Sequence, residues 1–472
     1  MMKLKTITKI VVLGGILPAA FSSCGTTLEK YKKPEANTEH LFRSNDVSDT
    51  TTIANVSWRE FFKDPKLQAL IEEGLNNSFD AKIALARIDE ASAYFKSAKK
   101  AVYPNIGLAG QVTHASSSYK DANGNVQVLS KNTNQYLFGI AATWEVDLWG
   151  KLSSTSKSKY ASFLQSKEAY NLVYSNLVAG VASYYYTLLS LDQQLRITQE
   201  SIDLLKQTVE TMEAMKKAGL QNGASVEQTK ATLYSTQASV PSIETAIIQT
   251  ENSLNLLLGR NSGPIDRSSF DEQEVPRELK YGTPFQMVAN RPDVRSAELA
   301  FRSAFELKNA AQASFYPTLS LVQGSVLGFG ASKISNLFRP ENIVANVISN
   351  LVQPIFAQGQ LNAGLAAAKA EQKIAYLTFE KTVITAGNEV VNVMALYTNS
   401  LKKNESRTNQ ILALKNSVEY TQLLLKAGEA NYLEVITAEA NLLSAQLSQV
   451  DDKLEQLNAS VNLYKALGGG TK

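Results

Sequence analysis

The stretches "MKKAGLQNGASVEQTKATL" (215–233) and "LKAGEANYLEVITAEANLL" (425–443) make the same glycine break at two places in the chain. Both carry Lys-Ala-Gly, then a polar run, then Val, Ala and Leu at matching positions, and they lie 209 residues apart. Glycine adopts a left-handed backbone at low cost, which suits the end of a helix. Each stretch therefore predicts a long helix that stops and turns back as a second helix.

The sequence on both sides of these breaks is duplicated. The shift of 209 also places Gly150 on Gly359 and Val226 on Val435. Nearer the start of each copy, a shift of 213 places Tyr103-Pro104 on Tyr316-Pro317. A register kept over more than 100 residues indicates two copies of one large unit. We assign the copies to 66–260 and 291–468. The middle segment between them, 261–290, is expected to be irregular and to form an equatorial belt halfway along the rod of long helices.

Each copy is expected to contain a helix, a strand hairpin, a long helix and a return helix. The long and return helices place apolar residues at alternating steps of four and three, which is typical of a coiled coil. Pro241 falls inside the first return helix and should bend it. The expected hairpin, long helix and return helix lie at 105–147, 148–218 and 222–259, and at 318–356, 357–427 and 431–467.

One predicted strand has a clear two-residue alternation. In "YLFGIAATWEVD" (136–147), Tyr136, Phe138 and Ile140 point to one side, and Leu137, Gly139 and Ala141 point to the other. Packing on the protein's own core would account for the apolar side. In an exported chain the same side also suits lipid, with the small and polar side facing water.

The N-terminus reads as an export signal. Residues 1–23 combine three lysines, a short apolar run and small residues before Cys24, the only cysteine of the chain. Its place after the cleavage region predicts a lipoprotein whose Cys24 carries a covalent lipid, although a free thiol is the alternative. Residues 24–65 are expected to be an extended segment. No apolar run is long enough for a transmembrane helix in the mature chain.

Charge and composition argue against other classes. Without its signal the chain carries 44 basic and 44 acidic residues, which gives no reason to expect nucleic-acid binding. His40 and His114 are the only histidines, and no catalytic or metal-binding pattern accompanies them. We expect no enzyme activity, no metal and no cofactor beyond the lipid.

The duplicated unit, together with four short motifs, resembles the TolC-like outer-membrane efflux proteins, in the lipoprotein branch of the OprM/NodT type. The resemblance covers nearly the whole mature chain. The motifs are "KKAVYPNI" (99–106), "WEVDLWGKL" (144–152), "RPDVRSAE" (291–298) and "QPIFAQGQL" (353–361).

The resemblance implies a mainly α fold with a small β part. Three protomers would each give four strands to one transmembrane β-barrel, above a periplasmic barrel of long coiled-coil helices. The protein would be a lipid-anchored outer-membrane exit duct with a large periplasmic part. Its partners would be two further copies, a periplasmic adaptor, an inner-membrane pump of the RND type and outer-membrane lipid.

The resemblance also implies site residues at the periplasmic end. The two turns would meet adaptor hairpins through Ala218, Gly219, Leu220, Ala427, Gly428 and Glu429. A ring that closes the tunnel would use Leu425, Glu429 or Glu434, although a solvated charge at a helix end accounts equally well for either glutamate.

Two alternatives remain open at the level of sequence. The same fold would serve as the duct of a type I protein-secretion system, and a non-conducting periplasmic coiled-coil scaffold lipoprotein belongs to a different class. The alternating strand 136–147 argues against the scaffold. Nothing in the sequence identifies the cargo.

Overall fold

The computed structural model describes residues 28–36, 38, 41–42, 51–120, 123, 126–275, 280, 282–321 and 326–471. Cys24, His40 and the expected signal 1–23 lie outside these residues. The fold class is confirmed, because the chain is mainly helical with a small sheet. The described residues divide into two compact units: those within 1–34, 90–163 and 299–376 form a strand unit, and those within 35–89, 164–298 and 377–472 form a helical unit.

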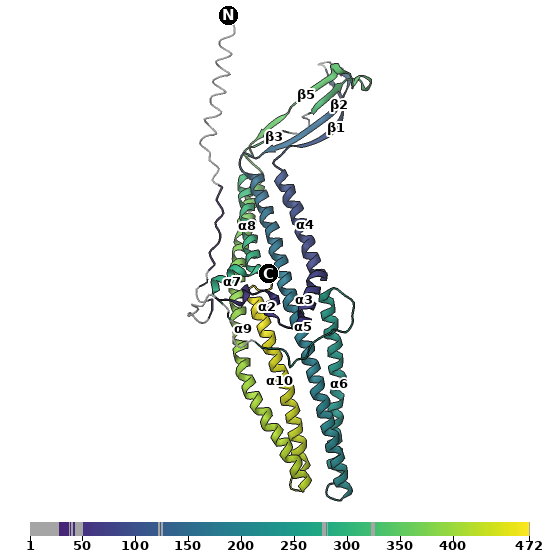
Figure 1. Ribbon diagram of the computed structural model, residues 1–472. Coiled ribbons are helices and arrows are strands. Elements are labelled where there is room, and N and C mark those ends of the chain that lie inside the picture. Colours follow the sequence, from purple (N-terminus) through teal and green to yellow (C-terminus); the bar gives the residue numbers. More distant parts are fainter. Residues whose placement is uncertain are drawn as a thin grey trace. The chain divides into compact units, whose positions relative to one another are not determined.

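The helices follow the duplication (Figure 1). In each copy a helix of 22 residues precedes the strands, and a very long helix with a return helix follows them. Pro241 lies inside α6, which continues through it. The bounds are α4 (Phe79–Lys100), α5 (Lys151–Lys217) and α6 (Gly223–Leu258) in the first copy, and α8 (Pro292–Ala313), α9 (Gln360–Ala427) and α10 (Tyr432–Ala466) in the second.

Left-handed glycines recur at repeat-related positions. Both glycines of the Lys-Ala-Gly breaks are left-handed, Gly219 at φ 76° and Gly428 at φ 77°. The glycines before α5 and α9 and those after α6 and α10 also form such pairs, at the same shift of 209: Gly150 with Gly359, and Gly259 with Gly468. Because L side chains rarely adopt this backbone, the duplication is visible in the chain path itself.

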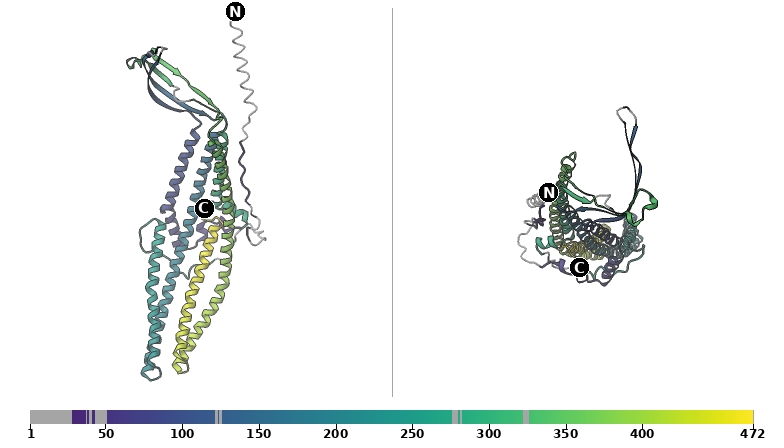
Figure 2. Two further views of the ribbon diagram at one scale, coloured as in Figure 1. Left: turned by 180° about the vertical axis from the view of Figure 1, so that it is seen from behind. Right: turned by 90° about the horizontal axis from the view of Figure 1, so that it is seen from above.

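The strands of the strand unit form an antiparallel sheet (Figure 2). Its order is β1, then β2, then β3 and β4 end to end, then β6 and β5. On one side β2 pairs with β1, and on the other side it pairs with β3 near its end and with β4 earlier along it; these in turn pair with β6 and β5. The bounds are β1 (Asn105–Lys120), β2 (Val126–Val146), β3 (Thr318–Leu321), β4 (Val326–Ala331), β5 (Ile343–Asn346) and β6 (Ser349–Val352). Two short 3-10 turns, η2 (Ile334–Asn336) and η3 (Pro340–Asn342), lie between β4 and β5.

The register gives the sheet one apolar face. Directly paired residues of an antiparallel sheet share a face. Phe138 on β2 pairs with Phe329 on β4, and Ile140 pairs with Leu108 on one side and Leu327 on the other. Leu108, Phe138, Ile140 and Leu327 are all exposed. The opposite face pairs Gly139 with Ala109 and Gly328, as the alternation predicted.

Two of the sequence motifs join the copies below the strands. Trp149 donates a hydrogen bond from Nε1 to the Pro317 carbonyl oxygen at 2.7 Å and stacks on Tyr316. Asp147 accepts from the backbone N–H groups of Leu152 at 2.9 Å and Ser153 at 2.8 Å, which caps the start of α5. "WEVDLWGKL" and the second Tyr-Pro therefore fix where the strands end and the long helix begins.

Residues 28–34 lie along α8 within the strand unit. Glu29 forms an ion pair with Lys308 at 2.6 Å, and the Glu29 carbonyl oxygen accepts from Asn309 at 3.0 Å. Tyr31 packs edge-on against Phe305. The extended segment expected at 24–65 is thus tied to the second copy, which the sequence did not indicate.

The helical unit contains short helices that the repeat analysis missed. The helix α3 (Pro65–Asn77) precedes α4, and α7 (Pro284–Asn290) lies in the middle segment expected to be irregular; η1 (Ile53–Asn55) and α2 (Trp58–Phe61) lie in the segment expected to be extended. Proline at the first helical position and a capping side chain start both longer ones, Asp64 for α3 and Thr283 for α7. Trp58, Leu67 and Ile71 from this region pack into the main core with α5, α6 and α10.

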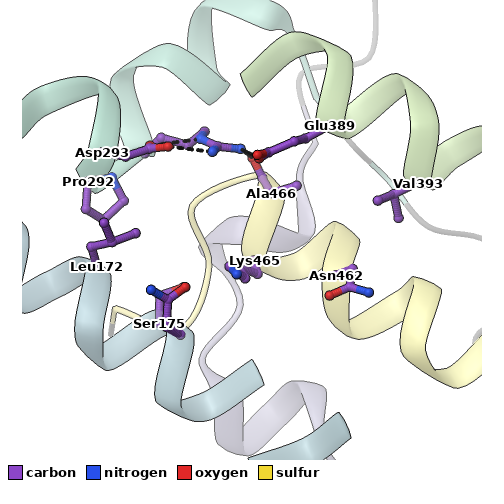
Figure 3. A pocket seen from close by; sticks show the side chains of 11 residues that line it. Leu172, Ser175, Pro292, Asp293, Glu389, Val393, Asn462, Lys465 and Ala466 are labelled. Atoms are coloured by element: carbon purple, nitrogen blue, oxygen red, sulfur yellow. Dashed lines mark hydrogen bonds and ion pairs between the residues drawn. The ribbon is translucent and has the colours of Figure 1, made fainter. Parts of the chain in front are cut away.

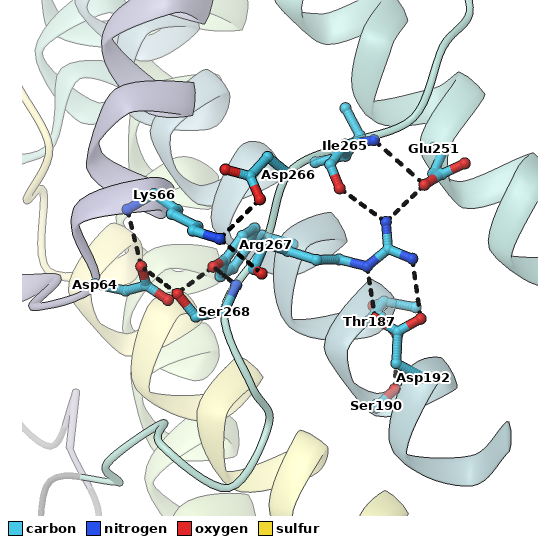
Figure 4. A network of polar contacts seen from close by, with 11 residues as sticks. Asp64, Lys66, Thr187, Ser190, Asp192, Glu251, Ile265, Asp266, Arg267 and Ser268 are labelled. Carbon is cyan, nitrogen blue, oxygen red and sulfur yellow. Dashed lines mark hydrogen bonds and ion pairs between the residues drawn. The ribbon is translucent and has the colours of Figure 1, made fainter. Parts of the chain in front are cut away.

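The middle segment is fixed to the long helices by Arg267 (Figure 4). Its guanidinium contacts Asp192 on α5 at 2.6 Å and Glu251 on α6 at 2.6 Å. On the other side of the segment, Lys66 contacts Asp266 at 2.7 Å, and the Asp64 carboxylate accepts from Tyr185 at 2.7 Å. Buried charge is costly unless it is paired, and here each buried charge has several partners.

Candidate functional site

The two glycine breaks form turns with the same hydrogen bonds. At the first turn Leu220 donates to the Met215 carbonyl oxygen at 2.9 Å, and at the second Glu429 donates to that of Leu424 at 2.9 Å. These are six-to-one bonds that close a helix end around a left-handed glycine. The return helices begin alike, because the Asn222 side chain accepts from Ser225 and the Asn431 side chain accepts from Leu433. We call the two turns the hairpin tips.

The residues predicted to meet an adaptor lie on the surface of the tips. Leu220 is 68% exposed at the first tip. Its repeat counterpart is the acidic Glu429, which is also exposed. The exposed residues are Ala218, Gly219, Leu220, Ala427, Gly428 and Glu429. Their contact with an adaptor stays a prediction.

The three gate candidates occupy different environments. Glu429 and Glu434 are exposed at the second tip. Leu425 is buried in a small cluster beneath both tips, together with Met212 of α5, Val226 of α6 and Val435 of α10. In this arrangement Leu425 joins the two hairpins, and a gate role for any of the three candidates stays a prediction.

Glu439 on α10 is a buried acid above this cluster, and it was not singled out from the sequence. It is 3% exposed and accepts hydrogen bonds through Oε1 from Thr208 of α5 at 2.8 Å and Gln422 of α9 at 2.9 Å. Oε2 is buried without a hydrogen-bond partner. Burial raises the pKa of the Glu439 carboxyl, and the two hydrogen bonds only partly oppose this.

A sequence signal for Glu439 did exist. It lies four residues after Val435 and four before Leu443, both of which pack inward. A glutamate on the apolar stripe of a helix has to be accommodated by neighbouring helices. The repeat adds a contrast, because the counterparts of Glu439 and Gln422 are Lys230 and Glu213, which form a half-exposed ion pair at 2.8 Å.

A cavity of about 290 Å³ lies higher in the helical unit, around Arg291 of the "RPDVRSAE" motif (Figure 3). The guanidinium contacts Asp293 at 2.6 Å and Glu389 of α9 at 2.7 Å, and it donates to the Ala466 carbonyl oxygen at 2.9 Å. Two carboxylates thus neutralise the buried arginine. The motif joins α8, α9 and the end of α10, which is a structural role.

Two further kinds of feature are absent from the described residues: a metal-binding cluster and a helix that could span a membrane. Among them, no three His, Cys, Asp or Glu side chains are grouped to hold a metal ion. None of the helices that the structure describes is long and apolar enough to cross a membrane.

Comparison with known proteins gives the family. The sequence profile described as "Outer membrane efflux protein" matches residues 70–260 and 284–469, one match on each copy. The probable outer membrane lipoprotein SilC of Salmonella typhimurium is 28% identical over 99% of both chains. The cation efflux system protein CusC of Escherichia coli O6:H1 is 28% identical over 91% of this chain and 92% of its own.

A solved structure agrees on the fold. The outer-membrane channel OprN superposes with a TM-score of 0.86 over 95% of this chain and all of that chain, at 24% identity. The similarity to OprN concerns the fold alone, whereas the profile covers well over half of the chain. The duplicated unit, the exposed apolar sheet and the paired hairpin tips are accordingly those of a transport protein: the chain belongs to the outer membrane efflux protein family.

Proposed function

We propose that three copies of this chain form the exit duct of a tripartite efflux system. Substrates would pass through it passively, from an inner-membrane pump and a periplasmic adaptor to the exterior. Besides family membership, one observation carries the proposal. The sheet exposes an apolar face, and among the described strands β1 at one edge and β5 and β6 at the other have no partner on their outer sides.

Open edges of this kind are incompatible with lipid in a single chain. Each unpaired backbone N–H or C=O in the hydrocarbon layer costs several kcal/mol, roughly 4–8 kcal/mol by transfer to an alkane. Joining β1 of one copy to β5 and β6 of the next pairs these groups. Closure after three copies would give a barrel with Phe138 and Ile140 facing lipid and Gly139 facing the lumen.

The remaining parts of the chain fit the same assembly. A lipid on Cys24 would hold the protein to the outer membrane. The hairpin tips carry small exposed residues at both turns, which would admit the close approach of adaptor helices. The printed names of SilC and CusC, a lipoprotein and a cation efflux protein, agree with a lipid-anchored efflux duct.

The test uses the full-length protein purified in detergent. Native mass spectrometry should give three chains per particle, and planar bilayers should show discrete conductance steps. A monomer that does not conduct would overturn the proposal in favour of a scaffold. Deletion of the gene should raise sensitivity to small toxic compounds; loss of a secreted protein instead, with unchanged sensitivity, would favour a protein-secretion duct.

A further inference from the structure

The first hairpin tip contains the dipeptide Asn222-Gly223, at the free end of the α5–α6 hairpin (Figure 1). Asn222 is exposed and is the N-cap residue of α6, and Gly223 is the first residue of that helix. Glycine has no side chain, so its backbone nitrogen is open to approach by the asparagine side chain that precedes it. The left-handed residue of this turn is Gly219, so the backbone does not require a glycine at position 223.

The cap hydrogen bond polarises the Asn222 carboxamide. The Ser225 backbone N–H donates to Asn222 Oδ1 at 3.0 Å. This bond draws electron density from the side-chain carbonyl carbon, Cγ. It would also stabilise the negative charge that forms on Oδ1 when a nucleophile attacks that carbon, as backbone N–H groups do in an oxyanion hole. The Ser225 hydroxyl donates to the Asn222 backbone carbonyl oxygen at 2.7 Å and holds the two residues together.

The backbone nitrogen of Gly223 is exposed to two sources of positive potential. It lies at the first position of α6, where an N–H group has no acceptor within the helix and the helix dipole has its positive end. A methyl group built on Gly223 would lie 3.6 Å from Lys216 Nζ, so an ammonium group is also beside this residue. Positive charge favours the deprotonated form of a nearby group. This amide nitrogen can therefore lose its proton more readily than an ordinary backbone amide.

We propose that Asn222 is a site of spontaneous deamidation. The Gly223 nitrogen attacks Asn222 Cγ, and the new C–N bond closes a succinimide ring. The side-chain nitrogen of Asn222 leaves as ammonia and takes up the proton that Gly223 lost. Water then opens the ring at either of its carbonyl carbons, which leaves aspartate or isoaspartate at position 222. The reaction requires no oxidant, cofactor or enzyme, and water is the only other reactant.

The second tip is a natural comparison, because the duplication places Asn431 at the equivalent position. Asn431 also caps its helix and accepts from the Leu433 N–H at 3.2 Å. The next residue is Tyr432, whose side chain crowds the backbone nitrogen, and the counterpart of Lys216 is the buried Leu425. The second cap thus lacks both the open nitrogen and the ammonium group. We therefore expect Asn431 to remain an amide.

Deamidation would change the charge of the first tip alone. Aspartate at position 222 would keep the cap, because Asp and Asn are about equally favourable there, and it would add a carboxylate two residues from Leu220. Isoaspartate would insert a methylene group into the backbone and displace the cap. In the proposed trimer each modified chain would bring one more negative charge to the periplasmic end. That consequence rests on the proposed function, whereas the modification does not.

Peptide mapping by mass spectrometry tests the proposal on the full-length protein. The protein is incubated at mildly alkaline pH in heavy-oxygen water, so that acid formed during the incubation carries the label and acid formed during later digestion does not. Asn222 should convert to aspartate and isoaspartate, which synthetic peptides identify. Asn431 should convert on the order of 100-fold more slowly, as expected when the reacting atoms are not aligned. Peptides with Asn123-Gly124, the other such dipeptide of the sequence, are quantified separately.

Three variants separate the contributing groups. Gly223→Ala is tolerated, since its methyl group makes only ordinary contacts with the Lys216 side chain, and it should slow the reaction at least about tenfold by obstructing the nitrogen. Lys216→Gln should slow it about twofold to fivefold, the effect of one exposed charge, whereas the matched control Lys217→Gln should not.

The outcomes are distinct. Conversion of Asn222 no faster than that of Asn431, or an unchanged rate in Gly223→Ala, would overturn the proposal. An unchanged rate in Lys216→Gln would overturn the role assigned to that lysine. None of these measurements depends on assembly of the trimer, so their failure is distinguishable from failure of the proposed function.

Discussion

Glu439 of α10 and Thr208 of α5 are hydrogen-bonded across the two hairpins at 2.8 Å, and the other oxygen of that carboxylate is buried without a partner. The bond connects the two copies of the duplicated unit close to the tips. It also puts an ionisable group where ionisation is unfavourable.

We therefore expect Glu439→Gln to stabilise the packing of the hairpins at neutral pH. A carboxyl whose pKa is higher when packed than when unfolded binds more protons in the packed state. This proton binding stabilises the packed state at low pH. The stabilisation is lost as pH rises from the ordinary pKa of 4.5 through the raised pKa. Glutamine imitates the protonated acid at every pH, so it removes the cost of burying the ionised carboxylate and keeps a neutral polar group in the same place.

The measurement is thermal unfolding between pH 4 and pH 8. The melting temperature of Glu439→Gln should exceed that of the unsubstituted protein at pH 8, and the difference should vanish toward pH 4. Glu434→Gln, a neutralised acid on the exposed side of the same helix, is the matched control and should show no such trend. A constant difference across the pH range would mean that ionisation of Glu439 has no part in it.

Alanine substitutions at two left-handed glycines should lower the free energy of unfolding by different amounts. Gly219→Ala would place its methyl group in open space, so only the backbone strain of about 1–2 kcal/mol applies. Gly259→Ala has the same strain, and its methyl group would lie 2.5 Å from the Asn77 carbonyl oxygen, where overpacking adds about 1–3 kcal/mol. Chemical denaturation should rank Gly259→Ala as the less stable protein. Equal losses would show that the contact with α3 yields easily.

Neutralising Glu429 should weaken cation preference if the second tip lies at the mouth of the tunnel. Three such carboxylates around one opening raise the local concentration of cations. In planar bilayers with a salt gradient, Glu429→Gln should move the reversal potential toward zero and lower the conductance. Leu220→Gln creates the same side chain at the equivalent position of the first tip without changing charge, and should leave selectivity alone. An unchanged reversal potential for Glu429→Gln would remove it as a gate candidate.

Cys24→Ser should abolish lipid attachment. The mature protein should lose the added acyl mass, and labelling with radioactive palmitate should disappear. Processing at the lipoprotein cleavage point should also stop, since the enzyme step depends on the modified cysteine. A Cys24→Ser protein that is still processed and still labelled would place the lipid elsewhere.

The sequence predicted features that depend on local chemistry. The turns at Gly219 and Gly428 followed from the backbone freedom of glycine, and the apolar face through Phe138 and Ile140 followed from the pleat of a strand. The short helices α3 and α7 had comparable signals, Asp64-Pro65 and Thr283-Pro284, which the search for long repeats passed over.

Contacts between distant parts of the chain could not be predicted in this way. Nothing near Tyr31 indicates that it packs on Phe305, and nothing near Leu425 indicates that Met212 and Val226 cover it. The first depends on where an extended N-terminal segment lies along α8, and the second depends on how helices from different copies are juxtaposed. The duplication relates some of these contacts to one another. Gln422 with Glu439 and Glu213 with Lys230 are contacts at the same positions of the two copies.

The ion pair between Glu29 and Lys308 has a geometric consequence for the height of the protein at the membrane. Glu29 follows Cys24 by five residue steps, and an extended chain covers at most about 3.6 Å per step, or roughly 18 Å in all. With a lipid on Cys24, the membrane surface must lie within that distance of Glu29, at the end of α8 that leads into the strands. Tyr316 and Trp149 stack near the same end, where aromatic rings favour the boundary between lipid and water. The N-terminal segment would then limit the distance between the lipid on Cys24 and the sheet. Inserting residues into this segment should remove that limit.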